Sequence, residues 1–152
     1  MIIEKPKIGF ASDHAGYELK QKLVMYIENE VGLHVTDYGT NSTTPVDYPD
    51  FAKKLIIEIE SNAIDLGVLI CGSGIGMSIC ANRNEFIRAA LCHNEELARL
   101  AREHNDANVL VLGAKFIALQ NSKKVLKTFL TAQFQGGRHL RRIKKCRMLN
   151  KA

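Results

Sequence analysis

The sequence has no long hydrophobic run, and no apolar segment approaches the roughly 18 residues that a membrane-spanning helix needs. Residues 1–7 also lack the apolar stretch of a secretory signal peptide. These two absences predict a cytoplasmic protein without a membrane partner. At 152 residues, 46% hydrophobic and 24% charged, the chain has the size and composition of a single globular domain that occupies residues 1–152.

Disulfide and zinc motifs are absent as well. The four cysteines, Cys71, Cys80, Cys92 and Cys146, include no CxxC pair. A chain of this length can build a hydrophobic core that does not depend on disulfides. We therefore expect free and mostly buried thiols, and no metal site. Only Cys71 adjoins a motif that suggests chemistry.

Acidic residues are missing from the last 17 positions, 136–152, which hold seven of the 21 Lys and Arg residues. The rest of the chain has 14 basic and 16 acidic residues, so its net charge is about −2. Such a tail is typical of a solvated helix face or a nucleic-acid patch, but no aromatic residues are interspersed in it. Arg138 and Arg142 lie four positions apart, on one face of an expected helix, where both can reach one phosphate group.

Strand-like and helix-like segments alternate five times along the chain. Apolar segments predict strands at 7–11, 34–37, 66–71, 87–91 and 109–112. This alternation predicts a single three-layer α/β/α domain with a Rossmann-like, five-stranded parallel sheet, followed by a basic helix at 138–148. Ligands of such sheets bind beyond the carboxyl ends of the strands, which selects residues 13–14, residues 71–76 and the segment after 112.

The segment after the third strand is rich in glycine, but it lacks the Gly-Lys-Ser or Gly-Lys-Thr of a Walker A loop and the GxGxxG spacing of a dinucleotide site. Residues 72–76 open a helix, so their N–H groups can bind an anion; the alternative is a tight turn that needs glycine for its backbone alone. Cys71 precedes this turn, where helix N–H groups favour a thiolate that can act as a general base. The alternative interpretation of Cys71 is a buried cysteine of the strand that has no catalytic role.

Two further polar pairs lie at the ends of expected elements. Asp13 and His14 follow the first strand, where they either hold sugar hydroxyls or phosphate or cap the next helix. His104 and Asn105 end a helix before the fifth strand, where a polar C-cap turn is the alternative. Each of these signals is weak by itself.

In combination, these segments resemble the type B ribose-5-phosphate isomerase family, which includes related galactose- and allose-phosphate isomerases. The matching stretches are Ala-Ser-Asp-His-Ala-Gly at 11–16, Asp-Tyr-Pro at 47–49, Ile-Cys-Gly-Ser-Gly-Ile-Gly at 70–76, His-Asn-Asp-Ala-Asn-Val-Leu at 104–110 and Gly-Gly-Arg-His at 136–139. They run from the first strand to the last helix, so the resemblance covers nearly the whole chain.

The resemblance implies a cofactor-free isomerase that interconverts ribose 5-phosphate and ribulose 5-phosphate through an enediolate, in the non-oxidative pentose phosphate pathway. It also implies a homodimer, or a dimer of dimers, whose active sites are shared between subunits. Cys71 falls on the general base of one branch of the family and His104 on the residue that opens the sugar ring, with Ser73 beside the base. The positions that match substrate contacts are Asp13, His14, Tyr48, Gly72, Ser73, Gly74, Ile75, Gly76, Asn105, Lys115 and the phosphate-binding pair Arg138 and Arg142.

Three positions depart from the family pattern. Met77 stands where a second branch has a catalytic glutamate, and a thioether cannot abstract a proton. Ser73 replaces a commoner threonine and keeps the hydroxyl. Lys115 replaces an arginine that often reaches phosphate across the dimer, and it supplies charge without a bidentate fork.

Three other functions remain open from the sequence. An isomerase of a six-carbon substrate, allose or galactose 6-phosphate, differs only in pocket size, which is worth about 1–3 kcal/mol. A non-catalytic phosphate-binding domain can share this fold, although Cys71 and His104 would then have no purpose. Nucleic-acid binding through the basic tail is the third, and it predicts that oligonucleotide binding depends steeply on salt. We expect no nucleic-acid partner, because the tail contains no recognised nucleic-acid motif.

Overall fold

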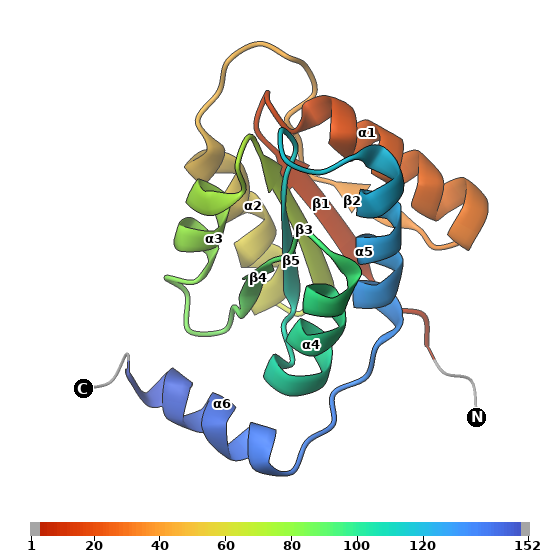
Figure 1. Cartoon of the computed structure of the whole chain (residues 1–152). Coiled ribbons are helices and arrows are strands. Elements are labelled where there is room, and N and C mark those ends of the chain that lie inside the picture. Colours follow the sequence, from red (N-terminus) through yellow and green to blue (C-terminus); the bar gives the residue numbers. More distant parts are fainter. Residues whose placement is uncertain (1–3, 150–152) are drawn as a thin grey trace.

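The structure, a computed structural model, describes residues 4–149; Lys151 of the basic tail lies outside this range. Strands and helices alternate as the sequence predicts (Figure 1). The strands are β1 (Ile8–Ser12), β2 (Val35–Asp37), β3 (Leu66–Cys71), β4 (Ala89–Leu91) and β5 (Val109–Gly113). The helices are α1 (Tyr17–Tyr26), the π-helical turn η1 (Ile27–Val31), α2 (Tyr48–Glu60), α3 (Ile75–Ala81), α4 (Glu95–Asn105), α5 (Leu119–Thr131) and α6 (Arg138–Met148).

The five strands form one parallel sheet in the order β2-β1-β3-β5-β4, which confirms the predicted architecture. β3 is central and all six of its residues are buried, as expected of an apolar strand covered on both faces. From β1 the chain crosses outward to β2, whereas β3 lies on the other side of β1. The carboxyl ends of β1 and β3 therefore flank the switch point at which such sheets bind ligands.

Helices cover both faces of the sheet. Helices α1, α4 and α5 pack on one face, against strand residues such as Phe10 and Ile70. Helices α2 and α3 pack on the other, against Leu69 and Cys71. Neighbouring strand residues thus point to opposite faces, and the side chain of Cys71 lies on the side of α2 and α3.

Local sequence signals explain several helix starts. Pro49 lies in the first turn of α2, where its fixed φ suits the helix. The Asn94 side chain accepts a hydrogen bond from Leu97 N–H at 2.9 Å and so caps α4. All four cysteines are free thiols.

Helix α6 has the bounds that the sequence predicts, and it lies at the amino end of the sheet, away from the β1–α1 and β3–α3 connections (Figure 1). Most of its residues are exposed, and only His139 is buried. Among residues 4–149, no helix combines the length and apolar character that crossing a membrane requires.

Candidate active site

Asp13 and His14 lie just beyond the carboxyl end of β1. Asp13 is 6% exposed, and its Oδ1 accepts a hydrogen bond from Gly16 N–H at 3.0 Å, so one carboxylate oxygen stabilises the turn that precedes α1. Nδ1 of the half-buried His14 accepts a hydrogen bond from Val46 N–H at 3.1 Å. In the neutral ring this bond places the imidazole proton on Nε2, which becomes a donor for a ligand.

Cys71 is the last residue of β3 and is 4% exposed. Its Sγ accepts a hydrogen bond from Gly74 N–H at 3.2 Å, within the turn that opens α3. The sulfur of Cys71 therefore faces a backbone donor at the start of α3. Ser73 Oγ accepts a hydrogen bond from Ile75 N–H at 3.2 Å, so the hydroxyl hydrogen can point to a ligand beside the sulfur.

The geometry of the turn at 72–76 requires two of its glycines. Gly74 has a φ of 79°, and a Cβ there would lie 2.5 Å from Leu91 Cδ1. At Gly76 a Cβ would lie 2.5 Å from Tyr48 Cζ, because the Tyr48 ring packs directly on the turn. Gly74 is therefore required by its backbone conformation, whereas Gly76 leaves room for the Tyr48 side chain, whose phenol this packing brings to the turn.

Lys115 reaches the same turn from the end of β5. Its N–H donates to Gly72 O at 3.0 Å, and its Cε would lie 3.4 Å from a Cβ placed on Gly72. These residues at the carboxyl edge of the sheet are called the strand-end group below; it consists of Asp13, His14, Tyr48, Cys71, Ser73, Lys115 and the turn 72–76.

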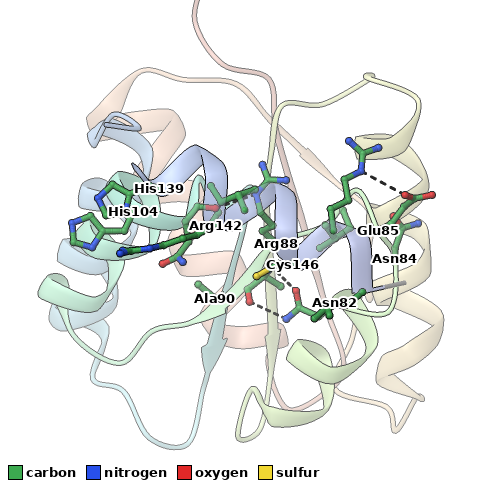
Figure 2. A pocket seen from close by; sticks show the side chains of 16 residues that line it. Asn82, Asn84, Glu85, Arg88, Ala90, His104, His139, Arg142 and Cys146 are labelled. Atoms are coloured by element: carbon green, nitrogen blue, oxygen red, sulfur yellow. Dashed lines mark hydrogen bonds and ion pairs between the residues drawn. The ribbon is translucent and has the colours of Figure 1, made fainter. Parts of the chain in front are cut away.

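A second set of predicted site residues surrounds a pocket of about 650 Å³ beneath α6 (Figure 2). His104 and Asn105, at the end of α4, line this pocket together with Arg142 of α6. The rings of His104 and His139 stack with their centroids 4.2 Å apart and their planes 10° apart. Residues His104, Asn105, Arg138, His139 and Arg142 are called the helix-end group below; Arg138 is the first residue of α6 and does not itself line the pocket.

The electrostatics of the helix-end group favour an anion. Burial, and then His104 and two arginines of α6, lower the pKa of His139, so its ring stays neutral between two helices. Within residues 4–149 the buried Nε2 of His139 has no hydrogen-bond partner. The sequence alone assigned no role to His139, although it lies in the Gly-Gly-Arg-His stretch, because only the fold shows that it contacts His104.

The two groups lie at opposite ends of the strands, the strand-end group at the carboxyl ends and the helix-end group at the amino ends. Cys71 pairs with Gly113, at the carboxyl end of β5, whereas His104 precedes Val109, at its amino end. β5 has five residues, and with a rise of about 3.3 Å per residue its ends lie about 13 Å apart. Cys71 and His104 of one chain therefore lie near opposite ends of β5, and the pocket beneath α6 is lined by His104 but not by Cys71.

The sequence matches the family model described as Ribose/Galactose Isomerase over residues 8–146. The chain belongs to the ribose/galactose isomerase family. The matched segment contains both the strand-end group and the helix-end group.

Individual members of the ribose/galactose isomerase family are similar over almost the whole chain. Ribose-5-phosphate isomerase B of Escherichia coli is 41% identical over 137 residues, which is 90% of this chain and 91% of that protein. The crystal structure of a ribose 5-phosphate isomerase from Thermotoga maritima superposes with a TM-score of 0.91 at 51% identity, covering 93% of this chain and 97% of that one. Ribose-5-phosphate isomerase B of Mycoplasma genitalium, solved with bound ribulose-5-phosphate, has a TM-score of 0.90 and 40% identity, with 95% and 96% covered.

Within this family fold, Met77 cannot replace a catalytic carboxylate. Its side chain is 0% exposed and belongs to the apolar layer beneath α2 and α3. Cys71, directly before the turn, has a thiol whose sulfur accepts a hydrogen bond from a backbone N–H.

Proposed function

We propose that this protein is a ribose-5-phosphate isomerase, which interconverts ribose 5-phosphate and ribulose 5-phosphate in the non-oxidative pentose phosphate pathway of the cytoplasm. The observation that carries the proposal is the thiol of Cys71 held at the switch point by Gly74 N–H, in a chain whose relatives bear that activity in their names. No cofactor or metal takes part in the proposed reaction.

The proposed chemistry is a proton transfer between adjacent carbons. The Cys71 thiolate takes the proton from C2 of the open-chain aldose, and the C–H electrons form the C1–C2 double bond while negative charge develops on O1. A proton passes from O2 to O1, the C2 carbonyl forms, and the thiol returns its proton to C1. Ser73 and the N–H groups of the turn 72–76 donate hydrogen bonds to the enediolate oxygens.

A second copy of the chain would complete each site. The strand-end group supplies a base and oxyanion donors, and the helix-end group supplies His104 and the arginines. Apolar side chains border the strand-end group, since Ile75 is 58% exposed and Phe116 is 75% exposed beside Ser73 in a groove of about 450 Å³. An exposed apolar rim of this kind suits contact with another subunit, and we propose a homodimer, or a dimer of dimers, with shared sites.

The function is tested by measuring ketose formation by the purified protein from ribose 5-phosphate and from allose 6-phosphate at equal concentrations. We expect a higher kcat/KM for ribose 5-phosphate. A higher kcat/KM for allose 6-phosphate would show that the protein is an isomerase of a six-carbon sugar phosphate instead. No turnover of either substrate would indicate a non-catalytic phosphate-binding domain.

His104→Asn tests the role in ring opening. Sugar phosphates with five or more carbons are mostly cyclic, whereas a four-carbon aldose 4-phosphate cannot close a ring because its phosphate blocks the hydroxyl. We expect the substitution to lower kcat for ribose 5-phosphate much more than kcat for the four-carbon substrate. Equal losses on both substrates would contradict ring opening by His104.

Single alanine substitutions of Arg138 and Arg142 test the phosphate clamp. Each removes a charged hydrogen bond worth roughly 1.5–3 kcal/mol, so KM should rise about tenfold to hundredfold. Lys144→Ala and Lys145→Ala are matched controls on the same helix, because neither lysine lines the pocket beneath α6. They should leave KM nearly unchanged, because salt screens charges outside the pocket. Equal effects of all four on oligonucleotide binding, with KM unaffected, would favour the nucleic-acid function.

A further inference from the structure

The connection from α4 to β5, residues 104–107, contains the last two residues of α4, His104 and Asn105, and one residue with an unusual backbone geometry. Asp106 ends the helix with a φ of 45°, in the left-handed region that non-glycine residues rarely adopt. The last carbonyl groups of a helix have no partners within it. Whatever binds these carbonyls therefore also fixes the direction in which His104 and Asn105 face the pocket.

Arg88 binds this turn with its side chain. Its Nε donates to Asn105 O at 3.1 Å and to Asp106 O at 2.9 Å. Its Nη2 lies 3.3 Å from Asp106 Oδ2, in an ion pair. A guanidinium at the carboxyl end of a helix also faces the negative end of the helix dipole, so its charge and its geometry both suit the carbonyls of the turn.

The backbone of Arg88 holds the far side of the same turn. Its N–H donates to Asn108 Oδ1 at 2.8 Å, and its carbonyl accepts hydrogen bonds from Asn108 N–H at 3.1 Å and Val109 N–H at 3.3 Å. One residue thus connects the start of β4 to both ends of the turn. The side chain of Arg88 also lines the pocket beneath α6, as Arg142 does (Figure 2).

We propose that Arg88 is a positioning residue for ring opening: by holding the 104–107 turn through Asn105 and Asp106, it keeps His104 directed toward the sugar ring of a bound sugar phosphate. This inference rests on the proposed function. Arg88 acts through His104 here and makes no contact with the reacting atoms. A direct role for Arg88 in binding the phosphate is the competing explanation, because the pocket also contains an arginine of the expected clamp.

Arg88→Met and Arg88→Lys test the positioning role with the two substrates used for His104. The methionine removes every side-chain contact, and the lysine keeps the charge but loses the fork that reaches two carbonyls and a carboxylate at once. We expect both variants to lose at least about tenfold in kcat for ribose 5-phosphate. KM, and kcat for the four-carbon aldose 4-phosphate, should stay within about threefold of the wild-type values.

The outcomes separate the alternatives. A raised KM with unchanged kcat would overturn the proposal in favour of direct phosphate binding, and equal losses on both substrates would overturn it in favour of general damage to the fold. Arg83→Met is the matched control, because Arg83 is exposed and lines a different pocket, between α2 and α3. It removes the same charge and should leave both activities unchanged.

A double-mutant cycle with His104→Asn shows whether Arg88 acts through His104. In that background Arg88→Met should cause no further loss on ribose 5-phosphate, whereas an independent loss would overturn the proposal. Failure of the proposed function is a separate result, namely the absence of ribose 5-phosphate isomerisation by the wild-type protein. If Arg88→Met does not fold, the lysine variant gives the same comparisons.

Discussion

Cys71→Ala should abolish the isomerisation of ribose 5-phosphate while the sugar phosphate still binds. The substitution removes the only group that can take the C2 proton in the proposed reaction, but it leaves the donors of the turn 72–76 and the phosphate contacts in place. The measurements are kcat and, by calorimetry, the dissociation constant of ribose 5-phosphate. More than about a tenth of the wild-type kcat, a barrier change under about 1.4 kcal/mol, would refute the assignment of the base.

Cys92→Ala is the matched control for this experiment. Cys92 is also buried, at 2% exposure, and it directly follows β4. Burial raises the pKa of its thiol to about 11, so Cys92 stays protonated at neutral pH and cannot serve as a base. The control variant should keep its kcat, and an equal loss in both variants would point to damage of the fold instead of loss of the base.

The sheet is predictable from the sequence because its strands are short, apolar and separated by amphipathic helices. β3 has the predicted bounds, 66–71, and α6 has the predicted bounds, 138–148. β4 is shorter than predicted, beginning at Ala89 instead of residue 87. The apolar pattern continues through Ile87, but Arg88 turns its side chain to the 104–107 turn, a partner far away in the sequence.

Lys20 shows a second limit of the sequence pattern. A lysine on a helix is expected in solvent, yet Lys20 is 0% exposed, and its Nζ lies 2.6 Å from Asp37 Oδ2. Asp37 Oδ1 also accepts a hydrogen bond from Gly39 N–H, and Gly39 O accepts one from Ser12 N–H. This chain of contacts supports the segment next to Asp13, and helical periodicity alone gives no sign of it.

The sequence predicts which residues belong to the candidate site better than it predicts where they lie in the fold. Strand-end positions follow from the general rule for parallel sheets, and that rule selected Asp13, Cys71 and the turn 72–76. His104 ends a helix that enters β5 from the opposite edge, so the same rule does not apply to it. The contacts that complete the helix-end group join α4 to α6, and packing between distant helices is not encoded in local periodicity.

Mixing two inactive variants should restore activity, because each proposed site takes its two groups from different subunits. A Cys71→Ala subunit retains an intact helix-end group, and a His104→Asn subunit retains an intact strand-end group. In a heterodimer of the two, one site carries both substitutions and the other carries neither. After unfolding and refolding of an equimolar mixture, half of the dimers are mixed, so about a quarter of all sites should be active in a symmetric dimer.

The measurement is ribose 5-phosphate turnover by the refolded mixture, compared with each variant refolded alone. Wild-type protein refolded with an equal amount of the Cys71→Ala/His104→Asn double variant is the matched control, because every site of that heterodimer lacks one group. Its activity should fall to about a quarter of the wild-type value at the same total concentration, whereas sites contained within single chains would retain about half. In every mixed dimer, refolding brings the intact strand-end group and the intact helix-end group together in one site. If the mixture of the single variants is no more active than either variant alone, the two groups do not meet across a subunit boundary.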